Sequence, residues 1–353
     1  MVDTRATIET PAFVVNEAIA QANIEKFQAH CNRVGLLLRP HIKTHKSVYF
    51  AKAQMAAGAV GITCQKISEA EVMADGGLKD ILITYNILGA AKRDRLKKLA
   101  DRGIRLQVTA DNSTVVAGLA DSFSDPANPL GVLVECDTGA GRCGVQSPAD
   151  AATLTREIVA ANGLTFAGLM TYPAVGGTDA AKGFMSETKR ILSKDGIDCP
   201  IISTGGSPDM WTAEPYDGAT EYRIGTYIFN DRSLVTRGTC GWSDCAANVI
   251  ATVVSIPTSE RAIIDAGSKM LTSDLLGLDG YGAIDDHPNL RISSLSEEHG
   301  TIEGPTAKLS VGERISIVPN HVCVVTNMGS TFWLENKSGD LTLQRVDARG
   351  CVL

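Results

Sequence analysis

The sequence lacks several features that would restrict its function. No apolar run in its 353 residues approaches the roughly 20 needed to cross a membrane, and the segment MVDTRATIETPAF has no apolar core like that of a signal peptide. Basic residues are not in excess, because 33 lysines and arginines stand against 40 aspartates and glutamates, for a net charge of −7. Nucleic-acid binding usually requires a basic patch. We therefore expect a cytoplasmic protein that binds neither a membrane nor nucleic acid.

Paired cysteine motifs are also missing. The nine cysteines are scattered, and no two have the CxxC spacing. Cys240 and Cys245 have no histidine beside them, which disfavours a metal site there. In a reducing compartment these cysteines are predicted to be free thiols, most of them buried. The 44% hydrophobic and 21% charged residues are ordinary values and allow a core of normal size.

Short apolar strands alternate with helix-like segments from about residue 16 to about residue 230. Asn16 and Ser147 stand where helix N-caps are expected, and Pro148 follows at a first helical position. Near-continuous apolar strands indicate a parallel sheet buried on both faces, and eight β/α units favour a closed (β/α)8 TIM-type barrel over residues 16–235. An open doubly wound sheet is the alternative. The predicted strands are 36–40, 60–63, 80–84, 105–109, 131–136, 166–171, 201–204 and 221–223.

The pattern changes after about residue 235. Segments such as NVIATVVSIP, RISIVP, HVCVVTN and LTLQRV are rich in β-forming residues and carry little helix signal. They predict a second, all-β domain over residues 236–353. The segment TPAFVV (10–15) resembles a strand that could join it, so residues 1–15 are assigned to that domain.

The motif RPHIKTHK follows the first predicted barrel strand and contains Lys43. Active sites of such barrels lie at the C-terminal ends of the strands. A lysine there is partly desolvated and near other cations, which would lower its pKa and free its amine as a nucleophile. Lys46, three residues on, is predicted to be a solvated helix residue. His41 and His45, considered alone, are more often packing histidines.

Two glycine-containing loops, STGGSPD (203–209) and RIGTYIFND (223–231), follow the seventh and eighth predicted strands. Loops at these positions commonly form the phosphate site of a barrel. Glycine lets backbone N–H groups approach a phosphate, and the hydroxyls of Ser207 or Thr226 could add hydrogen bonds. Two tight turns without a ligand are the alternative. With Lys43 after the first strand, the loops indicate a phosphate-bearing cofactor.

The segment CDTGAGRCGV (136–145) places Arg142 in a loop of small residues that could approach a flat ring. A guanidinium beside a pyridine nitrogen would disfavour protonation of that nitrogen. An arginine on a surface turn is the alternative. In PNHVCVVTN (319–327), His321 and Cys323 are two residues apart on a predicted strand, and therefore on one face. An imidazole and a thiolate suit zinc, with open positions left for water or substrate.

Taken together, RPHIKTHK, CQKISEAEVM, GAGRCGV, GTYIFND, DAGSK, SEEHG and PNHVC resemble the family of D-threonine aldolases and D-serine dehydratases. These are fold type III pyridoxal-phosphate enzymes with an alanine racemase-like barrel, and the resemblance covers nearly the whole chain. It departs after the sixth strand, where TYPAVGG lacks a histidine common in the family. The motif HxC is similar to that of the D-serine dehydratases, whereas QKISEAEVM is similar to that of the aldolases.

The resemblance implies roles for individual residues. Lys43 would be the Schiff-base lysine, and His321 and Cys323 would bind a divalent metal (zinc, manganese or magnesium). The residues implied to bind pyridoxal 5'-phosphate are His41, Arg142, Tyr172, Thr204, Gly205, Gly206, Gly225, Thr226 and Tyr227. The family also implies a homodimer.

Three classes of function follow from this resemblance. The first is a lyase that acts on D-3-hydroxy amino acids, either as an aldolase giving glycine and an aldehyde or as a dehydratase giving a 2-oxo acid and ammonia. The second is a racemase, which would need an acid or base from the β domain, with Tyr281 as the candidate. The third is a non-catalytic carrier of pyridoxal phosphate. The additional β domain with its HxC motif favours the lyase, and we predict the aldolase reaction.

Overall fold

The computed structural model describes residues 4–215 and 219–353, which divide into two compact units. The barrel unit comprises Phe27–Lys43, Val48–Gly225 and Cys351–Leu353. The β-rich unit comprises Met1–Lys26, Thr44–Ser47 and Thr226–Gly350. Each unit is described separately below.

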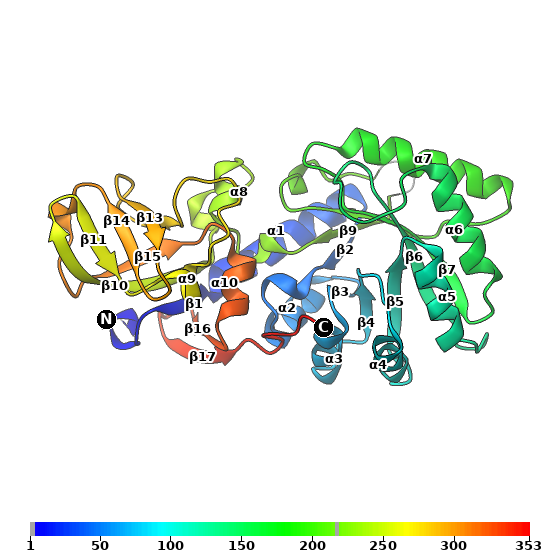
Figure 1. The fold of residues 1–353 in the computed structure, drawn as a ribbon, viewed down its shortest axis with the longest axis horizontal. Helices are drawn as coiled ribbons and strands as arrows, with labels where there is room; N and C mark the ends of the chain where they lie inside the picture. Colours follow the sequence, from blue (N-terminus) through cyan, green and yellow to red (C-terminus); the bar gives the residue numbers. More distant parts are fainter. Residues whose placement is uncertain (1–3, 216–218) are drawn as a thin grey trace. The chain divides into compact units, whose positions relative to one another are not determined.

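The barrel unit contains eight parallel strands, each close to a predicted one (Figure 1). Their order in the sheet is β2-β9-β8-β7-β6-β5-β4-β3, and the two end strands meet at a parallel bridge between His41 and Thr63. This contact nearly closes the sheet, which confirms the TIM-type barrel and excludes an open doubly wound sheet. The strands are β2 (Leu37–Pro40), β3 (Ile62–Cys64), β4 (Asp80–Ile83), β5 (Arg105–Ala110), β6 (Leu130–Cys136), β7 (Leu164–Thr171), β8 (Ile202–Gly205) and β9 (Glu221–Ile224).

An α-helix lies between each two successive barrel strands from β2 to β8, another precedes β2, and the two predicted caps are confirmed. The Asn16 side chain accepts a hydrogen bond from the Ile19 N–H at 3.0 Å, and Ser147 Oγ accepts one from the Asp150 N–H at 3.1 Å. These side chains satisfy N–H groups that the first helical turn leaves unpaired. The helices are α1 (Glu17–Val34), α2 (Val48–Ala57), α3 (Ile67–Asp75), α4 (Ala90–Ala100), α5 (Ser113–Ser122), α6 (Pro148–Ala160) and α7 (Thr178–Lys194).

A buried charge cluster occupies the barrel interior around Arg39 of β2. The Arg39 guanidinium donates to Glu221 Oε2 at 2.7 Å and to Asp80 Oδ1 at 2.6 Å. Arg39 and Glu221 are 2% and 3% exposed, and Glu221 also accepts a hydrogen bond from Ser203 Oγ at 2.7 Å. The pair holds together two neighbouring strands, β2 and β9.

Replacing Arg39 by leucine is expected to lower the free energy of unfolding by about 3–5 kcal/mol, because the buried Glu221 carboxylate loses its ion-pair partner and keeps the hydrogen bond from Ser203 Oγ at 2.7 Å and the charge of Arg223. Urea denaturation at pH 7 measures this loss. Arg105→Ala is the matched control, since Arg105 also pairs with Asp80, at 3.1 Å, but its side chain is 66% exposed. That pair is worth about 1 kcal/mol or less. Equal losses in the two variants would contradict the assignment.

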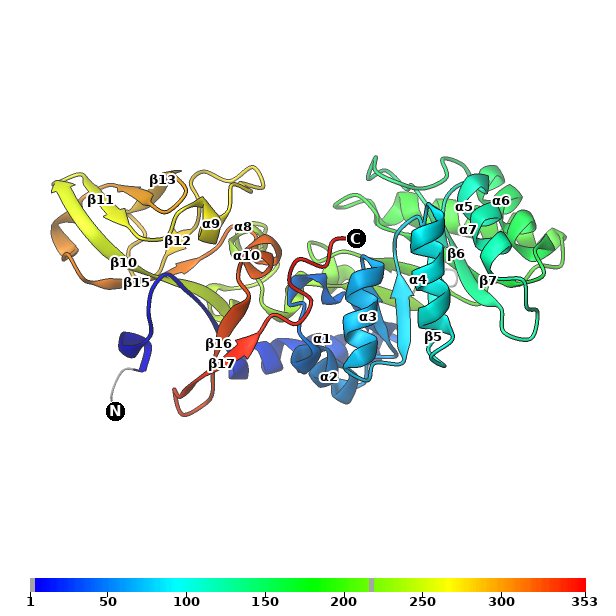
Figure 2. The same ribbon diagram turned by 60° about the horizontal axis from the view of Figure 1, so that its bottom comes forward.

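The β-rich unit is built on a nine-stranded sheet, shown from two sides in Figures 1 and 2. β1 (Ala12–Asn16) pairs antiparallel with β10 (Ala247–Thr258) and parallel with β16 (Thr331–Glu335). The strand predicted within TPAFVV therefore joins this sheet, as expected. The other strands are β11 (Arg261–Ile264), β12 (Ala283–Ile284), β13 (Arg291–Leu295), β14 (Gly300–Glu303), β15 (Arg314–Val318) and β17 (Leu341–Arg345).

The segment HVCVVTN is a helix, and its prediction as a strand is wrong. Helix α10 (Val322–Met328) begins directly after His321, whose backbone is extended, with φ −136° and ψ 103°. Its β-branched residues favour a strand by propensity, but Val322 and Val325 are three positions apart and both are buried, as on one face of a helix. The unit also contains the short helices α8 (Arg232–Thr236) and α9 (Ser268–Leu271).

The prediction for Lys46 is also wrong. Lys46 precedes α2 with a positive φ of 49°, and it is 5% exposed. Its ammonium group donates to the Ala348 carbonyl oxygen at 3.3 Å, and its own carbonyl accepts from the Ala348 N–H. These bonds to the chain near its C-terminus keep the side chain out of water.

All nine cysteines are free thiols, as predicted, although only four are buried: Cys31, Cys64, Cys136 and Cys245. Within residues 4–215 and 219–353, no helix is long and apolar enough to span a bilayer.

Candidate active site

His41 fixes the backbone at Lys43, directly after β2. The His41 Nε2 lies 3.1 Å from Gln65 Oε1, and the Lys43 N–H donates to His41 Nδ1 at 3.3 Å. Gln65 Nε2 donates to the Thr84 carbonyl at 2.8 Å, so its Oε1 faces His41 as an acceptor. This network requires a neutral imidazole that carries its proton on Nε2. Lys43 lies in the 3₁₀ turn Ile42–Thr44, at the C-terminal end of a barrel strand.

Arg142 lies against an aromatic ring and near a buried carboxylate. Its guanidinium carbon is 4.8 Å from the centre of the Tyr172 ring, and its Nη2 is 3.9 Å from Glu135 Oε1. Burial raises the pKa of Glu135, and the positive charges of Arg223 and Arg142 partly offset this. The structure therefore brings together two of the predicted residues, Arg142 and Tyr172. Tyr172 is 40% exposed, so one side of the pair is open to a ligand.

The glycines after the seventh barrel strand bring the backbone close to β9. A methyl group built on Gly205 would collide with the Arg223 carbonyl oxygen, and Gly206 has φ +139°. The Tyr222 hydroxyl donates to the Gly206 carbonyl at 2.8 Å. A methyl group on Gly206 would lie 3.9 Å from Tyr172 Cε2, so this glycine is near the Arg142–Tyr172 pair. Thr204, on the same strand, is buried.

The loop after β9 runs from the barrel unit into the β-rich unit. Gly225 follows β9, and Thr226 and Tyr227 belong to the 3₁₀ turn Thr226–Ile228. Tyr227 is 1% exposed. The glycines at positions 205, 206 and 225 would let backbone N–H groups approach a phosphate closely.

Cys323 and His321 lie in the β-rich unit with partners of their own. Cys323 Sγ is 3.1 Å from Thr44 Oγ1 and 3.7 Å from Thr226 Oγ1. His321 Nδ1 is 3.1 Å from Asp231 Oδ2. Burial opposes a charge on His321, but Cys323 and Asp231 outweigh it and raise the pKa of His321 to about 10. The His321 and Cys323 side chains therefore interact, although the backbone between these two residues is not a strand.

The donor set fits a divalent metal with open positions. An imidazole nitrogen and a thiolate are good zinc ligands, and the Asp231 contact leaves the second ring nitrogen of His321 for a metal. Among the described residues there is no group of three or more His, Cys, Asp or Glu that could hold a metal. A metal bound by His321 and Cys323 would therefore take its other ligands from water or substrate.

Sequence reasoning missed Asp231 and Thr44. An aspartate before Arg-Ser-Leu is a recognisable helix N-cap, and Asp231 does cap α8. Nothing in the sequence shows that its second oxygen faces a histidine 90 residues away. Thr44 is the residue after Lys43, and only the fold shows that its hydroxyl contacts Cys323.

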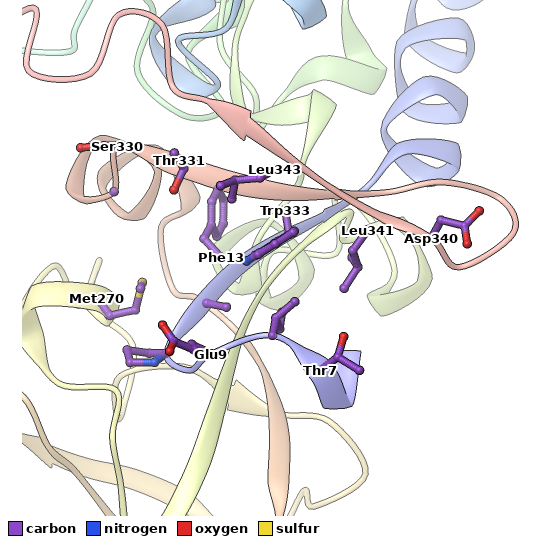
Figure 3. A pocket seen from close by; sticks show the side chains of 14 residues that line it. Thr7, Glu9, Phe13, Met270, Ser330, Thr331, Trp333, Asp340, Leu341 and Leu343 are labelled. Carbon is purple, nitrogen blue, oxygen red and sulfur yellow. The ribbon is translucent and has the colours of Figure 1, made fainter. Parts of the chain in front are cut away.

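A separate pocket of about 770 Å³ lies on the β-rich unit, beside β1, β16 and β17 (Figure 3). Its described lining contains no lysine, arginine, histidine or cysteine, and its charged side chains are the carboxylates Glu9 and Asp340, which lie apart. Two carboxylates would repel a phosphate. This pocket therefore does not suit the predicted cofactor.

Comparison with protein families defines the class. Residues 15–233 match the model of the alanine racemase N-terminal domain, and residues 246–334 match the putative serine dehydratase domain. The first is a pyridoxal-phosphate barrel, so the protein is of the fold type III class with an alanine racemase-like fold. Full-length relatives specify the family further.

A D-threonine aldolase from an Arthrobacter species is 33% identical over 344 residues, which cover 92% of this chain and 89% of the aldolase. The D-threonine aldolase structure from Filomicrobium marinum has a TM-score of 0.88 and 31% identity, over 99% of this chain and 98% of that one. The D-threo-3-hydroxyaspartate dehydratase from Delftia sp. HT23 has a TM-score of 0.89 and 28% identity, over 97% and 98%. The chain belongs to the D-threonine aldolase and D-serine dehydratase family.

The relatives are lyases of two kinds, aldolases and dehydratases. A D-threo-3-hydroxyaspartate dehydratase in which a cysteine was changed to alanine was solved in a metal-free form. The chain therefore belongs to a family of lyases that contains both aldolases and dehydratases.

Proposed function

We propose that the protein is a pyridoxal-phosphate- and divalent-metal-dependent lyase that cleaves D-3-hydroxy amino acids in a retro-aldol reaction. The observation that carries this proposal is the Thr44–Cys323 contact at 3.1 Å. Thr44 is the next residue after Lys43, so the amine and the metal-binding pair are linked through one peptide bond and one short side-chain contact. A racemase would have no use for His321 and Cys323.

On this proposal the chain's residues hold the cofactor from several sides. When bound, pyridoxal phosphate withdraws electrons from the substrate Cα and stabilises the charge left by bond cleavage. Lys43 supplies the amine that fixes the cofactor, and His41 holds the backbone of that lysine. Arg142 would face the pyridine nitrogen and disfavour its protonation, with Tyr172 next to the guanidinium. The phosphate is bound by Thr204, Gly205, Gly206, Gly225, Thr226 and Tyr227.

His321 and Cys323 would hold the metal, which would supply a Lewis acid for the 3-hydroxyl of the substrate. Two protein ligands leave room for that hydroxyl and for water. In the aldolase reaction the hydroxyl would lose its proton and the Cα–Cβ bond would break with its electron pair left on Cα. Cα would then take up a proton, giving glycine and an aldehyde. The D-configured substrate and the aldolase reaction are supported by the relatives that are D-threonine aldolases.

Dehydration is the second candidate, and Cys323 favours it. A cysteine at this position resembles the D-serine dehydratases, and a dehydratase relative was solved metal-free when a cysteine was replaced. In this reaction Lys43 would remove the Cα proton and the 3-hydroxyl would leave as hydroxide, giving an enamine. Water would then hydrolyse the corresponding imine to a 2-oxo acid and ammonia. Zinc, manganese and magnesium are all candidates for the metal.

Incubation of the holoenzyme with D-threonine distinguishes the two reactions. We expect acetaldehyde and glycine in equal amounts, measured by a coupled dehydrogenase assay and amino-acid analysis. L-Threonine is the matched control and should give no product. Formation of 2-oxobutanoate without acetaldehyde would replace the aldolase by the dehydratase, and L-threonine appearing from pure D-threonine would favour a racemase.

A further inference from the structure

We propose that Asp231 is a positioning residue that orients His321 and directs Nε2 of its ring, rather than Nδ1, toward the metal. This inference rests on the proposed metal site and deepens it. Asp231 lies between β9 and α8, and its carboxylate accepts a hydrogen bond from Val322, the first residue of α10 (both helices are labelled in Figures 1 and 2). Asp231 is 0% exposed, which is unusual for a carboxylate and calls for a full set of donors.

The Asp231 carboxylate accepts four hydrogen bonds, two on each oxygen. Oδ1 accepts from Ser233 Oγ at 2.6 Å and from the Leu234 N–H at 3.2 Å. Oδ2 accepts from the Val322 N–H at 3.2 Å and lies 3.1 Å from His321 Nδ1. Oδ1 therefore caps α8, whereas Oδ2 binds the ring of His321 and the backbone N–H of the next residue, Val322.

These contacts determine the proton on the His321 ring. An ionised carboxylate can only accept, so Nδ1 must carry a proton. Metal binding displaces a proton from the ring. Since Nδ1 donates to Asp231, Nε2 is the nitrogen that can give up its proton to a metal. A carboxylate on the other ring nitrogen also makes a histidine a stronger ligand and fixes its orientation.

The backbone around His321 is anchored to the same helix start. The Arg232 N–H donates to the Pro319 carbonyl at 3.0 Å, and the Ser233 N–H donates to the Asn320 carbonyl at 3.3 Å. Arg232 Nη1 also donates to Asn320 Oδ1 at 3.0 Å. Asp231, Arg232 and Ser233, at the start of α8, thus hold the segment that carries His321. They bind both its backbone and its imidazole ring.

The alternative is that Asp231 serves only as a helix cap. Asp231→Ser separates the two roles, because serine is a good N-cap but its side chain is one atom shorter and carries no charge. Ser147→Ala is the matched control, since it removes the N-cap of α6 in the barrel unit. Both variants should fold, which circular dichroism and thermal unfolding measure.

The readout is the dissociation constant for Co²⁺ alone, titrated into metal-free holoenzyme and followed by the thiolate-to-cobalt absorbance. We expect Asp231→Ser to bind Co²⁺ about 10–100-fold more weakly than the wild type. Ser147→Ala should bind within about twofold of the wild type, however much it is destabilised. Wild-type affinity in Asp231→Ser would overturn the inference. Absence of Co²⁺ binding by the wild type, or wild-type binding by Cys323→Ala, would instead overturn the metal site itself.

A second measurement applies if Asp231→Ser does not fold. The ¹⁵N NMR spectrum of the wild type, labelled at its six histidines and loaded with zinc, reports which ring nitrogen of His321 binds the metal. Metal on Nε2 with a proton on Nδ1 is the expected result. Metal on Nδ1 would exclude the assigned role of Asp231.

Discussion

Lys43→Ala is expected to lose lyase activity by about 10³-fold or more, because it removes the nucleophilic amine that also moves the proton at Cα. The visible absorbance of the lysine-bound cofactor should disappear at the same time. Borohydride reduction of the wild type followed by peptide mapping should place the adduct on the peptide that contains Lys43. The stability of the variant should change little, because Lys43 is half-buried at the end of a strand.

The control for this variant is Lys52→Ala. Lys52 lies on α2, nine residues further along the chain, and it is exposed. It should retain full activity and the full absorbance band. An adduct on any other lysine, or an active Lys43→Ala enzyme, would remove the basis of the proposed function.

Cys323→Ala carries the second largest expected effect. It leaves His321 as a single protein ligand, and a metal acting as a Lewis acid contributes several kcal/mol, so kcat should fall by about 100-fold or more. Metal content after gel filtration should fall with it. A chelator should reduce the wild type to a similar activity, and the ion that restores activity identifies the metal.

Cys351→Ala is the matched control, since Cys351 is also half-buried and lies in the barrel unit's C-terminal segment. It should keep its metal and its activity. If Cys323→Ala kept both as well, the reaction would have to proceed without the His321–Cys323 site.

The barrel could be predicted from the sequence because its signal is local and repeated. Each strand, such as GVLVEC before Arg142, is an uninterrupted apolar run, and parallel sheets buried on both faces require such runs. The caps at Asn16 and Ser147 were also visible, because an N-cap is a local preference. The closure of the sheet was predicted from the number of strands, whereas its position at the His41–Thr63 bridge was not.

The errors arose where distant residues decide the structure. Val322–Met328 contains strand-forming residues, but the carboxylate of Asp231 binds the first N–H of that segment and stabilises a helix. Lys46 lies just before a helix, where a lysine is usually solvated, but the chain near Ala348 covers it. The partners of His321 and Cys323 come from residues 90 and 279 positions away, and no local pattern encodes them.

The position of β1 between β10 and β16 has a consequence for biosynthesis. The barrel strands have all been synthesised once Ile224 is made, and each strand from β3 to β8 pairs with the next one in sequence. β1 is made before any of them, yet its register partners Ile250 and Trp333 come after the last barrel strand in the sequence. An unpaired strand edge is an aggregation hazard while it waits. A nascent chain stalled before Ala247 should therefore need a chaperone for its first strand, even with all its barrel strands complete.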